Sequence, residues 1–451
     1  MATAAEAVRA GFAGIVGESR VVSEEEACVS AGIDGKVPGA IVFPASAEQV
    51  AQVVKYAADN DLGVIACGGA SKLGVGNPPR KYDVALCLRD LQKVHHYEPA
   101  DLTAGVEAGM KFQEFQRLVG RDGLWLPLDP PGAERATLGG IVATNASGPL
   151  RHLYGAPRDM VLGMTVATSE GKLVKTGGRV VKNVAGYDLG KLMIGSFGTL
   201  GVIVEVNVKL YPLPAARETF ILSAGTLSIA RDMRLSVLNL PIEPAKLVLV
   251  DAEAAKLIHP VAGLNAQPQE PEIWVEAFGS NAVIERTRKE LGELGRAVGS
   301  KVQSYDGEEM QSAWRLISDF SNGFRKAYPE SVVLKTTLPL AHSEEFLSLA
   351  QQEAENEKVT MMSVSDVGVG ITHLGLAGSG SIHQRAALVT RLRTSVEKLG
   401  GALMVVAASA EFKAEVDAWG SARDGFKIMQ KIKAAWDPKG IFAPGRFVGS
   451  I

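Results

Sequence analysis

Glycines cluster in three segments of the chain, and this clustering is the pattern with the clearest chemical meaning. The densest cluster lies between residues 177 and 210, where Gly186, Gly195, Gly198 and Gly201 recur too often for a helix interior or a plain strand. Glycine density of this kind suits a backbone that passes close to a flat ligand, because a Cβ atom would clash there. The segment therefore predicts a rigid backbone surface for a bulky planar cofactor.

A second cluster occupies residues 68–77, directly after a predicted buried strand at 64–67. Consecutive backbone N–H groups in such a loop form an anion site, and the absence of side chains leaves room for phosphate oxygens. Lys72 adds a positive charge. The loop is neither a Walker A loop nor a dinucleotide fingerprint, because it lacks a terminal Gly-Lys-Ser/Thr and a following helix. An ordinary turn between strands is the alternative.

The third cluster, residues 137–148, has small residues at nearly every position. A ring system or a pyrophosphate can lie on such a backbone, while Thr137, Asn145 and Ser147 supply hydrogen-bonding groups. The alternative is a tight helix that packs against a sheet through its small residues. Those residues are Gly139, Gly140 and Ala143.

Alternating strands and helices surround these clusters between residues 37 and 213, which indicates an α/β region. Ser46 and Gln49 form a capping-box pattern ahead of a helix. A Gly-containing turn near 169–172 predicts a hairpin, and the valine alternation over 202–208 predicts a strand. Further predicted features are a helix face at Val50, Val53, Val54 and Ala57, strands at 64–67, 84–88 and 103–108, and a helix with Phe112, Phe115 and Leu118 on its inner side.

The texture of the chain changes after the Pro-Leu-Pro sequence at 212–214, which predicts a domain boundary. The remainder predicts an α+β domain with two ferredoxin-like halves around an antiparallel sheet. A proline-containing stretch at 260–271 predicts a surface loop. The predicted strands are 218–223, 246–251, 272–278, 331–338, 360–372 and 402–408. The predicted helices are 226–238, 281–297, 308–320, 343–356, 382–398 and 424–435.

Composition limits the possible partners and compartments. The 47 basic and 50 acidic residues give a net charge of −3, so we expect no nucleic-acid partner. The three cysteines, Cys28, Cys67 and Cys87, match neither a disulfide framework nor a zinc or iron–sulfur motif, which favours a reduced cytosolic compartment. No signal peptide and no run of about 18 apolar residues is present, so we expect no transmembrane segment.

The glycine clusters occur in the order found in the FAD-binding PCMH-type (vanillyl-alcohol-oxidase-like) flavoproteins, which the chain resembles. Within that superfamily it most resembles the glycolate oxidase FAD-binding subunit (GlcE-like). The resemblance is specific over residues 37–213 and the last 20 residues, and loose between them. The motifs that carry it are 68–77, 137–148, 154–159, the phrase Gly-Arg-Val-Val-Lys-Asn-Val-Ala-Gly-Tyr-Asp-Leu at 178–189, 195–203, and the tail at 436–446.

The resemblance implies an α+β fold class, with a PCMH-type FAD-binding domain of two α/β subdomains and a ferredoxin-like α+β cap domain. It implies an N-terminal segment (1–36), the FAD-binding domain (37–213), the cap or substrate domain (214–430) and a C-terminal segment that returns to the FAD domain (431–451). FAD is expected between the two domains, held noncovalently, because the loop at 68–76 has no histidine to anchor it.

The same resemblance assigns residues to the parts of FAD. The pyrophosphate would lie on Gly68, Gly69, Ala70, Ser71, Lys72 and Leu73. The flavin or its ribityl chain would contact Thr137, Gly140, Asn145, Ser147 and Gly148. The adenine end would lie near Ile203 and Val204.

Two departures from the family pattern concern catalysis. Glycolate- and D-lactate-oxidising relatives carry a His-x-Gly-Asp-Gly-Asn-x-His-type metal motif and a later Glu-His-Gly, and this chain has neither, so no metal site is expected. His373 is expected to be a structural residue on an apolar strand. Ala443 stands where relatives commonly show Asn. The candidates for a substrate carboxylate are Arg315, Arg325, Lys335 and His342, although a solvated surface charge is the better explanation of each.

The resemblance implies an FAD-dependent 2-hydroxy-acid oxidoreductase, namely the FAD-binding subunit of a glycolate oxidase-like complex that forms a 2-oxo acid and passes electrons to a partner. The expected partners are a glycolate oxidase-type catalytic flavin subunit and an iron–sulfur subunit. A noncatalytic electron-relay or scaffold subunit and a stand-alone flavin dehydrogenase for another hydroxy acid are the alternatives. The expected location is cytoplasmic, with peripheral attachment at the inner membrane through partners. No acid–base residue is assigned.

Overall fold

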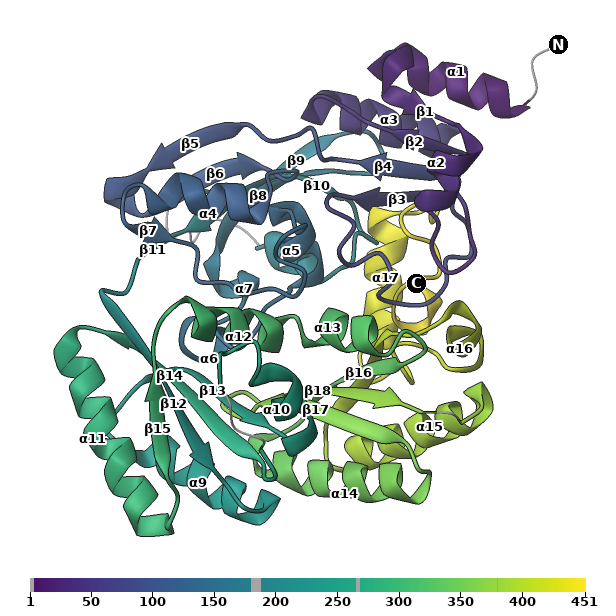
Figure 1. Ribbon diagram of the computed structural model, residues 1–451. Helices are drawn as coiled ribbons and strands as arrows, with labels where there is room; N and C mark the ends of the chain where they lie inside the picture. The colour runs from purple at the N-terminus through teal and green to yellow at the C-terminus, as the bar shows by residue number, and fades with distance from the viewer. Residues whose placement is uncertain (1–3, 180–187, 265–267, 379) are drawn as a thin grey trace. The chain divides into compact units, whose positions relative to one another are not determined.

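The computed structural model describes residues 4–179, 188–264, 268–378 and 380–451, and the chain forms two compact units (Figure 1). The first unit contains residues up to 146, 156–213 and 421–451. The second unit contains 147–155 and 214–420. Residues 147–155 thus group with the second unit and 421–430 with the first, and the predicted domain limits stay a prediction.

The first sheet of the first unit has the strand order β1-β2-β4-β3. Its strands β2, β4 and β3 are parallel, and β1 pairs antiparallel with β2. The strands are β1 (Val21–Val22), β2 (Ala40–Val42), β3 (Val64–Cys67) and β4 (Val84–Cys87).

Helix α3 (Ala47–Asp59) connects β2 to β3 and has the predicted Ser46 as its N-cap, whereas the Gln49 side chain bonds to the amide before the cap and so does not complete the predicted capping box. The Ser46 hydroxyl accepts a hydrogen bond from the Gln49 amide at 3.3 Å, and the Gln49 side chain accepts one from the Ala45 amide at 2.7 Å. The predicted apolar face of this helix is fully buried against the sheet.

The second sheet of the first unit is antiparallel, with the order β5-β6-β10-β8-β9. Its central strand is β10, and the valines predicted to alternate along it are buried. The hairpin of β8 and β9 confirms the turn predicted near 169–172. The strands are β5 (Val94–Glu98), β6 (Thr103–Glu107), β8 (Val161–Ala167), β9 (Leu173–Gly177) and β10 (Val202–Lys209); β7 (Leu124–Trp125) and β11 (Tyr211–Pro212) form a separate pair.

Short helices and the C-terminal segment complete the first unit. On α4, Val119 rather than the predicted Leu118 joins Phe112 and Phe115 in the core, because it lies four residues after Phe115. The remaining helices are α1 (Ala4–Val16), α2 (Glu25–Ser30), α4 (Phe112–Gly120), α5 (Leu138–Thr144), α7 (Pro157–Met160), α8 (Gly190–Met193) and α17 (Phe426–Trp436), with 3-10 turns η1 (Glu18–Arg20), η2 (Pro99–Asp101) and η4 (Val448–Ser450).

Hydrogen bonds attach the C-terminal segment to the rest of the first unit. The Lys433 ammonium donates to the Thr199 and Phe442 carbonyl oxygens at 2.8 and 2.9 Å and pairs with Asp437 at 2.7 Å. The Asp437 carboxylate accepts hydrogen bonds from the Ile441 and Phe442 amides. Because each of these groups is satisfied locally, the segment 436–446 has a defined path beside β3.

The second unit is built on one eight-stranded antiparallel sheet with the order β15-β12-β14-β13-β17-β18-β16-β19. Its two halves each have the ferredoxin-like order 4-1-3-2, and they meet at the pairing of β13 with β17. The strands are β12 (Ala216–Ser223), β13 (Pro244–Val250), β14 (Glu272–Gly279), β15 (Val302–Tyr305), β16 (Val332–Thr337), β17 (Thr360–Asp366), β18 (Ile371–Ala377) and β19 (Ala402–Ala407).

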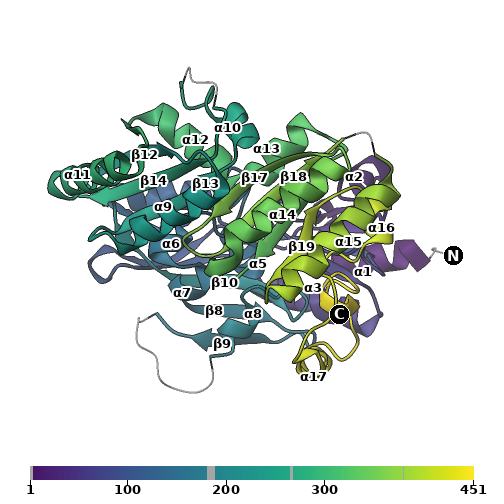
Figure 2. The same cartoon turned by 90° about the horizontal axis from the view of Figure 1, so that it is seen from below.

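Helices cover both faces of this sheet, as the view from below shows for α9, α14 and α15 (Figure 2). One face packs against α9 (Leu227–Asn239), α11 (Asn281–Val298), α14 (Ser343–Asn356) and α15 (Ile382–Lys398). The other packs against α10 (Ala252–Ile258), α12 (Glu308–Ser318) and α13 (Phe320–Ala327). The unit also contains α6 (Arg151–Tyr154), η3 (Leu340–His342) and α16 (Ala410–Glu415).

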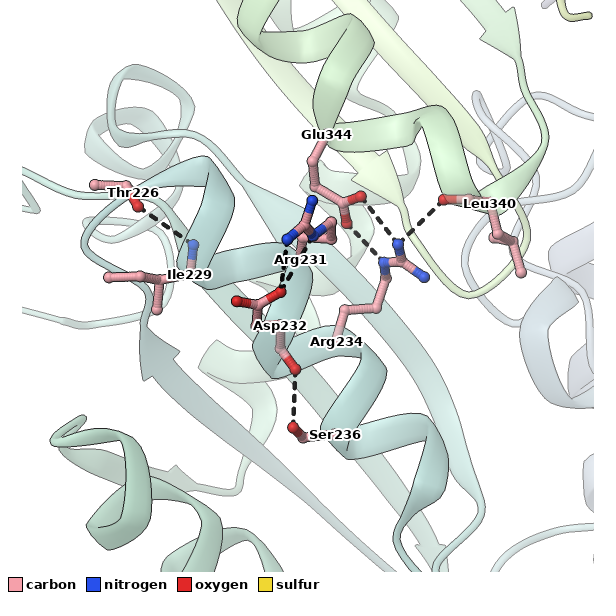
Figure 3. A network of polar contacts seen from close by, with 8 residues as sticks. All are labelled: Thr226, Ile229, Arg231, Asp232, Arg234, Ser236, Leu340 and Glu344. Carbon is pink, nitrogen blue, oxygen red and sulfur yellow. Dashed lines mark hydrogen bonds and ion pairs between the residues drawn. The ribbon is translucent and has the colours of Figure 1, made fainter. Parts of the chain in front are cut away.

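A buried ion pair joins α9 of the first ferredoxin-like half to α14 of the second (Figure 3). The Arg234 guanidinium donates to both carboxylate oxygens of Glu344, at 2.6 and 3.0 Å, and to the Leu340 carbonyl oxygen at 3.1 Å. Neighbouring polar groups on α9, such as Arg231 and Asp232, are exposed.

The predicted fold class is confirmed, and the main error lies in the second unit. The strand predicted at 360–372 is wrong, since the chain forms two strands joined by a tight turn at 367–370. Gly370 adopts a φ of +75° in that turn, which glycine tolerates and which a continuous strand excludes. The prediction also missed β15, α10 and α13. The predicted motif residues 180–187 lie outside the described residues, as do 265–267 of the predicted surface loop.

Candidate functional site

A pocket of about 900 Å³, counted with its solvent-open part, lies in the first unit where the glycine clusters meet. Its walls come from the loop after β3, from α5, from the start of β10 with the preceding turn, and from Arg446 of the C-terminal segment. Four segments that are distant in sequence therefore form one concave surface.

The loop after β3 contributes a backbone surface, and its glycines are required by close packing. A Cβ atom on Gly68 would lie 2.1 Å from Thr137 Oγ1, and one on Gly69 would lie 1.4 Å from the Arg135 carbonyl oxygen. Ala70 adopts a φ of +56°, so the chain turns sharply there. The Lys72 ammonium donates to the Pro131 carbonyl oxygen at 2.8 Å. The six residues predicted in this loop all line the pocket.

Arg446 holds this loop against the C-terminal segment. Its guanidinium donates to the carbonyl oxygens of Leu73 and Val75, and its own carbonyl oxygen accepts from the Asn77 amide at 3.1 Å. The residue is 6% exposed and lines the pocket. The sequence reading missed it as a site residue, although it closes the tail motif at 436–446.

Helix α5 shows that the two interpretations of the small residues at 137–148, ligand space and close helix packing, apply to different glycines. The Thr137 hydroxyl caps the helix by accepting from the Gly140 amide at 3.4 Å. A Cβ atom on Gly139 would lie 2.6 Å from the Ala108 Cβ atom, so this glycine permits close helix packing. A Cβ atom on Gly140 would meet only Thr137 Oγ1, at 3.3 Å. Packing therefore explains Gly139, whereas Gly140 leaves space in the pocket.

The structure brings together most, but not all, of the predicted cofactor residues. Ile203 lines the pocket, whereas the Val204 side chain lies in the core between α3 and the sheets. Asn145 ends α5 with a φ of +48° and accepts a hydrogen bond from the Arg158 amide at 3.3 Å. Ser147 and Gly148 belong to the second unit. Cofactor contact by each predicted residue stays a prediction.

The turn before β10 adds pocket residues that the prediction did not select. Phe197 and Gly198 line the pocket, both with positive φ, at +54° and +69°. The Phe197 amide donates to the Ala143 carbonyl oxygen at 2.8 Å, which joins this turn to α5. The glycine density at 195–201 was the signal that could have found them.

Lys335 and Arg151 of the second unit differ from the other residues considered for binding a substrate carboxylate. Lys335 of β16 has Arg151 of α6 nearby, and removal from water together with this guanidinium lowers the pKa of Lys335 to about 8. Within the described part of the chain, neither side chain has a carboxylate partner. His373 lies directly opposite Lys335 on β18, and its Nδ1 atom lies 3.5 Å from the Ser321 hydroxyl.

The other predicted carboxylate candidates already have local partners. Arg315 donates to the Ser312 hydroxyl at 2.6 Å, and Arg325 to the Pro329 carbonyl oxygen at 3.3 Å. His342 pairs with Glu345 at 2.8 Å. Among the residues that the structure describes, no three His, Cys, Asp or Glu side chains gather as a metal site.

Comparison with known families agrees with this arrangement. The family described as "FAD binding domain" matches residues 38–177, and "FAD linked oxidases, C-terminal domain" matches residues 213–447, more than half of the chain. The chain belongs to the FAD-linked oxidases.

Two relatives of this FAD-linked oxidase show how far the similarity extends. It is 26% identical over 430 residues to glycolate oxidase subunit GlcD of Bacillus subtilis, covering 91% of this chain and 89% of the relative. It is 25% identical over 427 residues to D-2-hydroxyglutarate dehydrogenase of Stutzerimonas stutzeri, covering 91% and 90%. In structure it resembles substrate-bound p-cresol methylhydroxylase, with a TM-score of 0.75, 17% identity and coverage of 98% and 96%. This last likeness confirms the PCMH-type fold.

The pocket of this FAD-linked oxidase fits its cofactor. Lys72 and Arg446 are the charged residues among the described lining residues, and both are cationic, as a pyrophosphate requires. The glycine backbones of the loop after β3 and of α5 leave the volume that Cβ atoms would fill, and apolar side chains such as Ile65, Leu88 and Val202 suit an aromatic ring system. FAD is the cofactor, and its noncovalent attachment stays a prediction.

Membrane spanning was tested on the helices of the described residues. None of them is both long enough and apolar enough to cross a bilayer.

Proposed function

We propose that this FAD-linked oxidase converts a small 2-hydroxy acid to the corresponding 2-oxo acid. The named relatives, a glycolate oxidase subunit and a D-2-hydroxyglutarate dehydrogenase, support this reaction class across more than nine-tenths of the chain. When bound, FAD supplies the two-electron acceptor for the carbon that carries the hydroxyl group.

Residues of the first unit would hold the pyrophosphate, the flavin or its ribityl chain, and the adenine end of FAD. The loop at 68–73 and Lys72 would take the pyrophosphate, because this glycine-containing backbone and a cation line the pocket there without a carboxylate. Thr137 and Gly140 would border the flavin or its ribityl chain, and Ile203 the adenine end. Arg446 would act by holding the loop in place through its two carbonyl contacts.

The single observation that carries the substrate class is the cation pair of the second unit. Arg151 and Lys335 are neighbours with no carboxylate partner in the described chain, and like charges of this kind repel unless an anion joins them. We propose that they bind the substrate carboxylate, with the guanidinium offering a two-pronged contact.

His373 is our proposed acceptor for the hydroxyl proton. It is the cross-strand neighbour of Lys335, and directly opposite side chains lie about 4.5–5.5 Å apart at Cβ. A carboxylate held by Lys335 would therefore place the adjacent hydroxyl carbon within reach of the imidazole. Neutral imidazole accepts a proton near physiological pH.

The test is anaerobic mixing of the flavin-loaded protein with glycolate, D-lactate, L-lactate and D-2-hydroxyglutarate, followed by the loss of flavin absorbance. Reduction by at least one acid is expected. Lys335→Met should abolish reduction without changing flavin content, and His373→Gln should lower the rate while carboxylate binding persists. A wild-type chain that none of the acids reduces would contradict the proposal.

A second candidate is a noncatalytic subunit that relays electrons within a glycolate oxidase-type complex. The absence from the sequence of the family's histidine metal motif favours it, and the GlcD relative is by name a subunit. We propose an iron–sulfur protein as the electron-accepting partner, because three dispersed cysteines cannot bind a cluster. Flavin that is reduced only after a catalytic flavin subunit is added would support this candidate.

A further inference from the structure

Two of the three cysteines lie side by side in the wall of the cofactor pocket. Cys67 ends β3 and Cys87 ends β4, and the two are register partners in this parallel pair. Neighbouring strands are about 4.7–4.9 Å apart. That spacing is inside the range of Cα separations, about 4.4–6.8 Å, that a disulfide can bridge. Side chains at paired positions point to the same face of the sheet, so the two sulfur atoms face each other.

The two cysteines differ in exposure and in thiol pKa, as the two members of a reactive dithiol do. Cys67 is partly exposed and lines the pocket, whereas Cys87, its neighbour on β4, is only 7% exposed. A hydrogen bond from the Cys67 thiol, then the Arg89 backbone N–H and the Arg89 charge, lower the pKa of Cys87 to about 7. The same hydrogen bond and burial raise the pKa of Cys67. Cys87 is therefore the thiolate and Cys67 the thiol that supports it.

We propose that Cys67 and Cys87 form a peroxide-sensitive dithiol, and that its oxidation to a disulfide weakens the binding of FAD to the pocket.

The chemistry balances with hydrogen peroxide as the oxidant. The Cys87 thiolate attacks one peroxide oxygen, the O–O bond breaks, and the Cys87 sulfur becomes a sulfenic acid while the second oxygen leaves as water after taking a proton. The Cys67 sulfur then attacks the Cys87 sulfur, the S–O bond breaks, and a second water leaves with the Cys67 proton. Two thiols and one peroxide give one disulfide and two waters. A small oxidant is required because Cys87 is only 7% exposed.

Oxidation is expected to disturb the pocket because the residues that follow Cys67 are closely packed. A disulfide needs Cβ atoms about 3.8 Å apart, closer than the strand spacing, so β3 must shift toward β4. The next two residues are Gly68 and Gly69, which already lie against Thr137 and the Arg135 carbonyl oxygen. A shift there moves the loop that forms the phosphate side of the pocket.

The experiment uses the full-length protein stripped of FAD, treated with hydrogen peroxide and then with catalase. Peptide mass spectrometry is expected to find the Cys67 and Cys87 peptides cross-linked, with the loss of two hydrogens, and dithiothreitol should reverse the link. FAD titration is expected to show an apparent Kd raised about tenfold, which is ~1.4 kcal/mol. Bound FAD should slow the oxidation, since it covers Cys67.

Three serine variants make the test specific. Cys87→Ser should bind FAD as the untreated protein does and should keep that affinity after peroxide. Cys67→Ser alters a pocket residue, so its test is that its own FAD affinity is the same before and after peroxide. Cys28→Ser, which alters the buried cysteine of α2, should respond as the wild type does. Sulfinic acid at either residue without a cross-link would overturn the proposal. A reversible cross-link that leaves the FAD affinity unchanged would overturn its functional half.

Discussion

Arg234 of α9 and Glu344 of α14 form a two-pronged ion pair whose side chains are only 2% and 3% exposed. The pair joins the two ferredoxin-like halves of the second unit on one face of its sheet, at contacts of 2.6 and 3.0 Å. Because the Leu340 carbonyl oxygen accepts a further hydrogen bond, the guanidinium is well satisfied. Removing either residue would therefore leave the charge of the other buried without its partner.

Glu344→Gln should destabilise the second unit by about 3–5 kcal/mol, because Arg234 would remain buried without its counter-charge. The measurement is urea unfolding followed by the fluorescence of the buried Trp274 and Trp314. Arg231→Ala is the matched control, since its pair with Asp232 on the same helix is exposed and should matter by less than about 1 kcal/mol. Equal effects from both variants would show that the buried pair has no special role.

Gly140→Val should remove most of the bound FAD while the protein stays folded, because the side chain enters the pocket and meets only Thr137 Oγ1. Gly139→Val is the comparison, and its clash with Ala108 should cost folding stability, typically about 1–3 kcal/mol. The measurements are the flavin absorbance per chain and the unfolding midpoint of each variant. Normal flavin content in Gly140→Val would refute its place beside the cofactor.

Gly198→Val should lower both stability and flavin content, although a Cβ atom there would contact nothing within 4 Å. The cause is its φ of +69°, a conformation that costs most residues roughly 1–2 kcal/mol. Gly198→Asn should retain more stability, since Asn tolerates this region. Thermal unfolding of both variants tests the idea, and equal losses would point to pocket filling instead of backbone strain.

Carboxylate binding should weaken as the pH rises through about 8. The folded-state pKa of Lys335 lies near 8, below its ordinary value of 10.5, so its charge is lost above that pH. The affinity for oxalate, measured by calorimetry, should then fall by up to about tenfold per pH unit. Lys335→Met should bind oxalate weakly with little pH dependence in this range. A wild-type affinity that is constant from pH 7 to 9 would remove Lys335 from the anion site.

Asp251→Asn should stabilise the protein more at pH 8 than at pH 5. Burial raises the pKa of Asp251 from 3.8 to about 6, so between these values the folded state binds more protons than the unfolded state, and stability falls as the pH rises. Asn keeps the cap on the Ala254 amide and a partner for the Ser363 hydroxyl without the charge. Unfolding free energies at both pH values test this, and an identical change at each would contradict the assignment.

Much of the first unit could be predicted because its helices and strands follow from patterns among residues close in sequence. The N-cap at Ser46, the buried face of α3 and the valine alternation of β10 depend on near neighbours in sequence, and the glycine clusters marked the pocket. Arg446 could not be selected this way, since its contacts with Leu73 and Val75 cross more than 370 residues. The pairing of Cys67 with Cys87 likewise depends on strand register, which spacing in the sequence does not reveal.

The second unit shows where prediction from the sequence failed. Its order of strands and helices followed from apolar runs, yet the break between β17 and β18 was missed because apolar residues continue through 367–371. Lys335 was indistinguishable from Arg315 and Arg325 in sequence. Its burial, together with the neighbouring Arg151 from a segment nearly two hundred residues earlier, separates it from ordinary surface cations.

The chain passes between its two units at 146/147, 155/156, 213/214 and 420/421, and this has a consequence for synthesis on the ribosome. Translation delivers Arg446, Lys433 and Asp437 only after the whole of the second unit. The first unit therefore stays incomplete while the second is made, and we expect the coenzyme to be captured only after these residues have joined it. A gene fragment that stops near residue 213 should yield a colourless product.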